Sequence, residues 1–335
     1  MRLTIKTPAK VNLLLKVNGI RTDNYHEILT VLHMISLYDE ITFTPLESSV
    51  ARHRDETLLN SIANRESKAP CEFLTGFTDF EGDIKIVCNA NGVSRPKGIQ
   101  KIENFLGPPE DNLAFRAAKL LKEKTKVSAG VRIEIRKGIP ISAGLGGGSS
   151  DAAATLIALN YLWKTGLSRH ELMEIGSSLG TDVPFFIYGT AAIGTGRGDK
   201  LMPFKPLPAL NLLIVNPLFP VSTAWVYRNY NKPQYLTDID YNVKILSSFS
   251  LNELSNDLED VVIKEYPLVK ELKKALAENG AIAAVMTGSG PTVFGIYPDE
   301  TAINEAKKGM QRRGYWVEAV KTLESSPLEE YLIGL

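Results

Sequence analysis

The 335-residue sequence has few cysteines, no excess of either charge and no long apolar run. Its two cysteines, Cys71 and Cys88, have neither metal-ligand nor redox spacing, so we interpret them as reduced thiols. Lysine plus arginine equals aspartate plus glutamate at 38 each, so no net field attracts nucleic acid or a membrane surface. No segment reaches the roughly 20 apolar residues of a membrane helix, and Met1 leads almost directly into a predicted strand. We therefore expect a cytoplasmic protein, a monomer or homodimer, without nucleic-acid or membrane partners.

The chain is long enough for two domains that share a cleft. Pro203, Pro206 and Pro208 indicate a boundary, so we predict domains over residues 1–205 and 206–335. Apolar alternation and capping residues predict strands over residues 3–7, 11–17, 28–43 (with a turn near Tyr38-Asp39), 84–88, 131–135, 211–215, 281–286, 292–297 and 316–322. They predict helices over residues 113–122, 152–162, 168–179, 222–230 and 267–279. The largely polar region of about residues 48–105 is interpreted as an insertion: a surface subdomain, an oligomer contact or partial disorder.

The most informative segment is a glycine loop, Gly144-Leu145-Gly146-Gly147-Gly148-Ser149-Ser150, between a predicted strand and a predicted helix. Ser150 or Asp151 is placed to cap that helix. Glycines allow backbone N–H groups to approach a phosphate, and the helix dipole favours its charge. A flexible linker is not expected between a strand and a helix. Neither Walker A nor Rossmann spacing is present, so the loop predicts nucleotide triphosphate binding of another kind.

Four other segments have a recognisable order around this loop. They are Thr7-Pro8-Ala9-Lys10-Val11-Asn12-Leu13 with Tyr25-His26, then Leu179-Gly180-Thr181-Asp182-Val183-Pro184, then Gly194-Thr195-Gly196-Arg197-Gly198-Asp199, and last Met286-Thr287-Gly288-Ser289-Gly290-Pro291. Together with the loop, they resemble the three signature motifs of the GHMP small-molecule kinases. The first segment and Tyr25-His26 are similar to the members that act on a cytidine diphosphate-linked methylerythritol, rather than on mevalonate or homoserine. The resemblance covers most of the chain outside about residues 48–105.

This resemblance implies an α+β fold with an S5-like N-terminal domain, a ferredoxin-like C-terminal domain and an active site in the cleft between them. It implies ATP-dependent phosphorylation of the substrate's 2-hydroxyl, in the non-mevalonate route to isoprenoid precursors. ATP and Mg²⁺ are the expected cofactors. Two other hypotheses stay open: another GHMP kinase with a different alcohol substrate, and a catalytically silent nucleotide-binding protein.

Asp182 and Lys10 are the predicted catalytic residues. A carboxylate at Asp182 can take the proton of the attacking hydroxyl or only orient it. An inward-facing lysine in the apolar strand around Lys10 needs a compensating charge, and Asp182 would provide it. Asn12 falls on the same strand face as Lys10 and should line the same pocket. Thr181 is expected beside Asp182.

Tyr25 and His26 are predicted to recognise the pyrimidine, because Tyr can stack on a base and His offers one donor and one acceptor. Tyr227 or Trp225 would supply the opposing aromatic face. Relatives usually have glycine where this chain has Asn24. Asn is the non-glycine residue best able to adopt a positive φ, so we expect the turn to persist.

On the nucleotide side, Gly144 to Ser150 should wrap the phosphates, with Ser149 or Ser150 near a phosphate or Mg²⁺. Asn112 and Lys137 match positions beside the adenosine in such kinases, although Lys137 also fits a solvated strand end. Gly290, in Gly288-Ser289-Gly290, is expected to bring the C-terminal half against the substrate.

Overall fold

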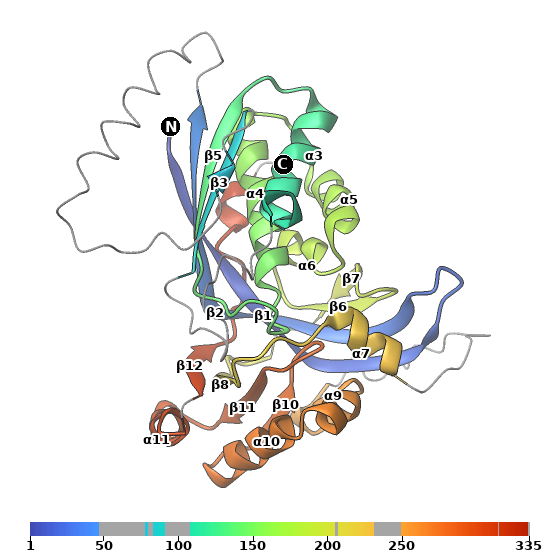
Figure 1. Cartoon of the computed structure of the whole chain (residues 1–335), viewed down its shortest axis with the longest axis vertical. Coiled ribbons are helices and arrows are strands. Elements are labelled where there is room, and N and C mark those ends of the chain that lie inside the picture. Colours follow the sequence, from blue (N-terminus) through green and yellow to red (C-terminus); the bar gives the residue numbers. More distant parts are fainter. Residues whose placement is uncertain are drawn as a thin grey trace, which may run out of the picture.

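The computed structural model describes residues 1–46, 78–79, 83–90, 108–204, 207–230, 249–313 and 315–333. Within these ranges the chain forms two sheets with helices packed against each (Figure 1). The first sheet has the path β3-β4-β5-β2-β1-β9, with β6 and β7 attached to β2. The second has the order β10-β11-β8-β12. The predicted insertion falls mostly outside the described residues.

The first sheet is built on a long antiparallel hairpin of β1 (Leu3–Ile20) and β2 (His26–Leu46). The remaining strands are β3 (Thr78–Asp79), β4 (Ile84–Asn89), β5 (Gly130–Arg136), β6 (Ala192–Thr195), β7 (Lys200–Pro203) and β9 (Ser255–Asn256). β4 runs parallel to β5, and β5 runs antiparallel to β2. The strand predicted at residues 84–88 is confirmed, and the strands predicted at 3–7 and 11–17 are one continuous element.

The turn predicted near Tyr38-Asp39 is wrong. β2 stays extended through these residues, and a β-bulge takes the place of the turn: Pro8 pairs with Tyr38, whereas Ala9 pairs with Ile35. Proline has no N–H to donate to a ladder, so a bulge beside Pro8 interrupts pairing where a donor is already missing. β1 can therefore continue past the bulge and carry Lys10 into the interior.

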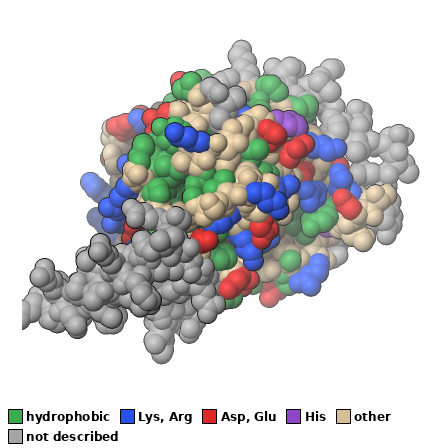
Figure 2. Space-filling model, turned by 90° about the horizontal axis from the view of Figure 1, so that it is seen from above, with side chains coloured by type: hydrophobic (Ala, Val, Ile, Leu, Met, Phe, Trp, Pro, Cys, Tyr) green, Lys and Arg blue, Asp and Glu red, His purple; other side chains and the backbone are tan. Residues whose placement is uncertain are grey.

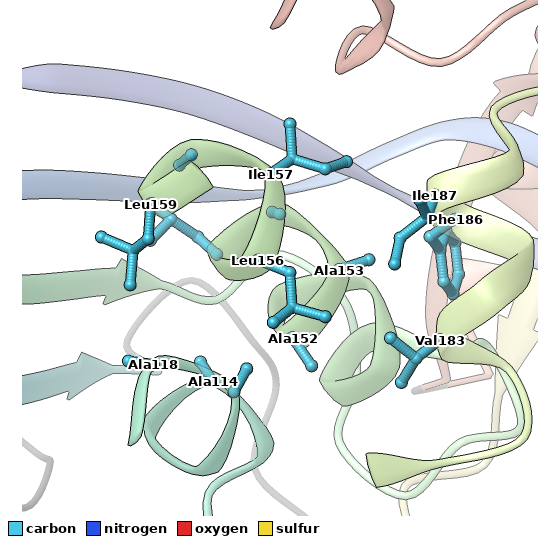
Figure 3. Packing of buried hydrophobic residues seen from close by; sticks show 14 of the residues in the cluster. Ala114, Ala118, Ala152, Ala153, Leu156, Ile157, Leu159, Val183, Phe186 and Ile187 are labelled. Carbon is cyan, nitrogen blue, oxygen red and sulfur yellow. The ribbon is translucent and has the colours of Figure 1, made fainter. Parts of the chain in front are cut away.

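Helices α3 (Leu113–Thr125), α4 (Gly147–Trp163), α5 (Arg169–Leu179) and α6 (Val183–Tyr188) pack together beside the first sheet (Figure 1), after a short 3₁₀ turn η2 (Pro109–Asp111). The helix predicted over residues 168–179 is confirmed, and Ser168 and Glu171 form a capping box at its start. α4 is central: Ala152 and Leu156 are fully buried in the cluster that α3 and α6 also join (Figure 3). Burial of this helix on most of its surface fixes the position of its N-terminus.

α4 begins at Gly147, five residues before the predicted start, and its N-cap is Gly146 without a side-chain cap. Ser150 and Asp151 therefore lie inside the first turn and are not caps. Their side chains make long-range contacts instead, since Ser150 Oγ donates to Pro8 O at 2.6 Å and Asp151 accepts from Lys137. Tertiary hydrogen bonds have replaced local capping here.

The second sheet consists of β10 (Ala283–Met286), β11 (Val293–Tyr297), β8 (Asn211–Asn216) and β12 (Trp316–Lys321). Its helices are α7 (Thr223–Asn229), α9 (Glu259–Glu265), α10 (Leu268–Glu278) and α11 (Glu300–Gln311), with a 3₁₀ turn η3 (Leu251–Glu253). The last 3₁₀ turn, η4 (Glu329–Tyr331), returns to the first sheet's helices and packs against α4. α9 and α11 were not predicted. Leu213 and Val215 pack toward the helices, whereas Leu212 and Ile214 join a core with Val11 of β1. The two sheets thus share apolar contacts along β1, where the site lies.

Charged side chains of both signs are interspersed on the face shown in Figure 2, in keeping with the equal numbers of basic and acidic residues. Among the described residues, no helix combines the length and apolar character needed to span a membrane.

Candidate active site

A cavity of about 480 Å³ lies where β1, the glycine loop and the second half of the chain meet. The lining residues before residue 205 are Lys10, Asn12, Leu15, Ile28, Thr30, Cys88, Asp111, Asn112, Leu113, Lys137, residues 140–144 and 146–149, Asp151, Thr181, Asp182, Arg197 and Gly198. Those after residue 205 are Thr223, Tyr227, Gly288 and Ser289. The predicted catalytic pair and most of the predicted nucleotide residues therefore share one cavity.

Lys10 and Asp182 are brought together from β1 and the start of α6. Lys10 Nζ lies 3.4 Å from Asp182 Oδ2 and donates to Asn12 Oδ1 at 2.7 Å. The Lys10 side chain is 4% exposed and that of Asp182 is 32% exposed. The ammonium is thus buried between two oxygens, while the carboxylate remains open to the cavity. A hydroxyl entering the cavity can reach Asp182.

Asn12 connects this pair to both halves of the chain. Its Nδ2 donates to Thr30 Oγ1 at 2.8 Å, and its backbone N–H donates to Thr287 Oγ1 at 3.0 Å. Thr30 in turn donates to Leu14 O at 2.7 Å. Both threonines are buried, so the orientation of the Asn12 amide is fixed. Thr30 and Thr287 were not predicted.

The glycine loop is pressed against Lys10 and the second half of the chain. Gly144 has φ +77°, and a Cβ there would lie 2.4 Å from Thr287 O. At Gly146, with φ +73°, a Cβ would lie 3.0 Å from both Lys10 Cγ and a Phe186 ring carbon. Only glycine combines this backbone conformation with such close approach. Leu145 is buried, and its carbonyl accepts from Lys10 N at 3.0 Å.

The two loop serines differ. Ser150 is fully buried, and its hydroxyl is engaged by Thr7 Oγ1 and Pro8 O. Ser149 is half-buried and lines the cavity. Of the two serines that the sequence offered near a phosphate or Mg²⁺, Ser149 is therefore the one whose hydroxyl can reach a ligand.

Lys137 is buried, which contradicts the reading of a solvated strand end. Its Nζ donates to Asp39 Oδ2 at 2.5 Å and to Asp151 Oδ2 at 2.7 Å, and Asp39 Oδ1 also accepts the N–H groups of Gly138 and Ile139. The two carboxylates raise the pKa of Lys137, although burial alone would lower it. Burial, opposed by Lys137, raises the pKa of Asp151 well above its ordinary value. The same burial raises the pKa of the Cys88 thiol to about 12.

Asn112 has a structural task as well as a place in the cavity lining. It is the N-cap of α3, and its Oδ1 accepts from Ala114 N at 2.9 Å and from Phe115 N at 3.3 Å. This hydrogen bonding leaves the amide nitrogen of Asn112 available to the cavity.

Aromatic side chains gather at the end of the β1–β2 hairpin. His26 lies 5.1 Å from Tyr227 between ring centroids, with the planes tilted by 37°, and 6.2 Å from Tyr230 in an edge-on contact. Trp225 instead contacts Tyr266, so Tyr227 is the aromatic residue at the cavity. Burial lowers the pKa of His26, whereas burial and the nearby Asp182 charge raise the pKa of Tyr227. Both rings are therefore neutral at neutral pH.

Tyr25 and His26 are not among the residues that line the cavity. They lie behind two that are, since Tyr25 contacts Arg197 and His26 contacts Tyr227. Asn24 adopts φ +63°, as expected for the turn before Tyr25.

Thr181 lines the cavity beside Asp182. On the opposite side, Ser289 Oγ lies 2.7 Å from Thr223 Oγ1 and both residues line the cavity. Gly290 does not line it. Gly290 has φ +78° and closes the turn beneath, where a Cβ would lie 2.5 Å from Met286 Sδ.

Comparison with known families and proteins identifies the family of this chain. Residues 112–190 match the GHMP kinases N terminal domain, and residues 237–315 match the GHMP kinases C terminal domain. The chain is 36% identical to the 4-diphosphocytidyl-2-C-methyl-D-erythritol kinase of Pelobacter propionicus, over 95% of this chain and 98% of the relative. It is 38% identical to that of Geobacter sulfurreducens, over 96% and 99%. The chain belongs to this family of GHMP kinases.

Solved structures of related kinases have the same fold. A crystal structure of a 4-(cytidine 5'-diphospho)-2C-methyl-D-erythritol kinase matches with a TM-score of 0.68 and 29% identity, covering 95% of this chain and 99% of that one. An L. major mevalonate kinase matches with a TM-score of 0.62 at 15% identity, covering 96% of each chain, which shows the shared fold alone. The expected GHMP kinase fold is confirmed, and the chain is an ATP-dependent small-molecule kinase.

Proposed function

We propose that this kinase transfers the γ-phosphoryl group of ATP to the 2-hydroxyl of 4-diphosphocytidyl-2-C-methyl-D-erythritol, in the non-mevalonate route to isoprenoid precursors. The main support for this function is the Lys10–Asp182 ion pair, which lies in the same cavity as the glycine loop and Tyr227. An acceptor site, a phosphate site and an aromatic site are thereby adjacent, as the reaction requires.

Asp182 is the proposed partner of the attacking hydroxyl. The hydroxyl oxygen attacks the γ-phosphorus, ADP leaves, and the hydroxyl proton passes to Asp182 or, after a late transfer, to solvent. Lys10 pairs with this carboxylate and would stabilise negative charge on the substrate oxygen as it forms. Asn12 orients Lys10, because its Oδ1 accepts from the ammonium at 2.7 Å.

The glycine loop is the proposed phosphate site. Backbone N–H groups of residues 144–149 and the N-terminus of the 17-residue helix α4 would bind the ATP phosphates. We assign Asn112 to the adenosine side of this loop. Lys137 is assigned a positioning role beneath it, because both of its recorded partners are buried carboxylates.

The residues present fit a bound Mg²⁺. Ser149 presents a hydroxyl to the cavity, and Asp151 Oδ1 is a buried oxygen for which no hydrogen-bond partner is found in the described part of the chain. Mg²⁺ is usually held by one or two protein oxygens together with substrate phosphates. Ser149 and the phosphates would hold the ion, which would neutralise charge on the transferring group.

Tyr227, His26 and Tyr25 are assigned to the cytidine end of the substrate. A neutral His26 offers one donor and one acceptor to a pyrimidine edge, and Tyr227 offers a ring face. Thr181 is assigned to the substrate beside Asp182, and Gly290 supports the turn that closes the cavity. Residues 1–205 and 206–335 are the proposed domains, and the cytoplasm is the proposed location.

ADP release by the full chain with Mg²⁺-ATP tests this function. Acceptors are the cytidylylated methylerythritol, mevalonate, homoserine and none. Release with the cytidylylated compound alone is expected. Release with another alcohol overturns the substrate, and no release with any acceptor favours a catalytically silent nucleotide-binding protein.

A further inference from the structure

The turn between β6 and β7 carries a motif, Thr195-Gly196-Arg197-Gly198-Asp199, to which the reaction above gives no task. Gly196 has φ +69° and Gly198 has φ +97°, so both adopt the left-handed conformation that glycine favours. A Cβ at Gly198 would lie 3.1 Å from Ile28 Cδ1. The turn is therefore packed closely against the start of β2, beside the aromatic residues.

Glu27 binds this turn to the β1–β2 hairpin. The residue is 1% exposed, its Oε1 accepts from Gly196 N at 2.7 Å, and its Oε2 accepts from Arg21 Nη1 at 2.8 Å. Ile28 N also donates to Gly196 O at 2.8 Å. This carboxylate joins the two turns, because their separation would cost the buried Glu27 the hydrogen bond that it accepts from Gly196 N.

Arg197 is held on two sides within this arrangement. Its Nε and Nη2 donate to Asp199 Oδ2 at 3.1 and 2.5 Å, and its guanidinium carbon lies 5.1 Å from the centre of the Tyr25 ring. Asp199 Oδ1 accepts from Arg197 N at 3.2 Å, which fixes the carboxylate as well. The ion pair with Asp199 is made through Nε and Nη2, and the guanidinium also has a hydrogen bond with the Tyr25 side chain. The Arg197 side chain is 29% exposed and lines the cavity.

Arg197 differs from the other two basic residues that line the cavity in the described part of the chain. Lys10 is engaged by Asn12 and Asp182, and Lys137 is enclosed by Asp39 and Asp151. Arg197 is the most exposed of the three side chains. Its guanidinium has one nitrogen outside the ion pair with Asp199, and this nitrogen can bind an anion.

We propose that Arg197 binds the diphosphate of the nucleotide-linked substrate, with Tyr25 and Asp199 holding its guanidinium in place. The proposal rests on the substrate assigned above. In that substrate the diphosphate separates the reacting alcohol from the cytidine. With the alcohol at Asp182 and the base at His26 and Tyr227, the diphosphate falls between them. Arg197 lines this cavity and touches Tyr25 at its cytidine end.

The test is calorimetric binding of cytidine, CMP and CDP to the full chain, with the nucleotide site saturated by Mg²⁺ and a non-hydrolysable ATP analogue. Arg197→Met removes the charge with little change in length, and Arg197→Lys keeps the charge without the fork. Arg136→Met is the matched control, because Arg136 is 75% exposed and its recorded partner is Glu40 at 3.4 Å. Melting temperatures verify that each variant is folded.

Arg197→Met is expected to weaken CDP about tenfold while changing cytidine less than about twofold, the size of one lost charge-assisted hydrogen bond. The CDP affinity of Arg197→Lys should lie between those of Arg197→Met and the unsubstituted chain. The CDP affinity of Arg136→Met should equal that of the unsubstituted chain. Equal weakening of CDP and cytidine would overturn the proposal, since Arg197 would then only position Tyr25. Unchanged CDP binding would overturn it too. Failure of the proposed function appears separately, as an unsubstituted chain that releases no ADP with the cytidylylated acceptor.

Discussion

Lys10 Nζ lies 3.4 Å from Asp182 Oδ2, although the two residues are 172 positions apart in the sequence (182 − 10). The pair is asymmetric: the ammonium is buried and the carboxylate is open to the cavity. This asymmetry suits phosphoryl transfer, because the exposed carboxylate can contact the substrate while the buried ammonium stays paired with it.

Asp182→Asn should lower kcat at least about 100-fold, because the amide can neither take a proton nor pair with Lys10 as an anion. ATP affinity should change less than about threefold, because the glycine loop is untouched. Single-turnover kinetics and analogue binding measure the two effects separately. Asp83→Asn is the control, since Asp83 is 45% exposed and pairs with Lys122 at 3.0 Å. Near-normal turnover of Asp182→Asn would exclude both the base and the orienting role.

His26 should make binding of the cytidylylated substrate sensitive to pH. Burial lowers its pKa below the ordinary 6.5, so the neutral ring persists at pH 6.5 and above. Protonation at lower pH removes the ring's acceptor nitrogen. KM for this substrate should therefore be flat from pH 8 to 6.5 and rise below, while KM for ATP stays flat.

His26→Gln is the matched variant, because its amide keeps one donor group and one acceptor without titrating. Its KM for the cytidylylated substrate should show no rise between pH 6.5 and 5.5. An identical rise in both proteins would assign the titration to another group.

Local patterns predicted much of the site. The strand around Lys10, the glycine loop and the capped helix after Ser168 each form from neighbouring residues, so spacing and propensity carry the information. The GHMP motifs added Asp182 as the partner of Lys10. The structure confirms that these two side chains meet.

Contacts between distant segments could not be predicted in this way. Asn12 bonds to Thr287, which is 275 residues away, and Lys137 bonds to Asp39, which is 98 residues away. Nothing in the sequence near Lys137 distinguishes a buried lysine from a solvated strand end, because its partners arrive from β2 and α4. The bulge beside Pro8 could not be predicted either, because it depends on how β1 pairs with Ile35 and Tyr38 of β2.

Cys88 should be nearly inert to alkylation in the folded protein. Burial raises its pKa to about 12, so roughly one thiol in ten thousand is ionised at pH 8, and the thiolate is the reactive form. In a Cys71→Ser chain, iodoacetamide labelling followed by mass spectrometry should be at least about 100-fold slower in buffer than in denaturing urea. Equal rates would show that the strand β4 opens readily.

Lys137→Met should destabilise the chain by about 3–5 kcal/mol, because it leaves Asp39 and Asp151 as buried carboxylates without their cation. The pKa of Lys137 is raised in the fold, so its stabilisation is complete below the ordinary 10.5 and is lost only as pH rises through the folded value. Urea unfolding should therefore show a deficit that persists up to pH 9. The deficit should shrink as pH falls through the pKa of Asp151, which burial raises well above its ordinary value, because the protonated group no longer needs the cation. Arg136→Met, at an exposed neighbour, should change stability by less than about 0.5 kcal/mol. A deficit below about 1 kcal/mol for Lys137→Met would contradict the need for a cation between Asp39 and Asp151.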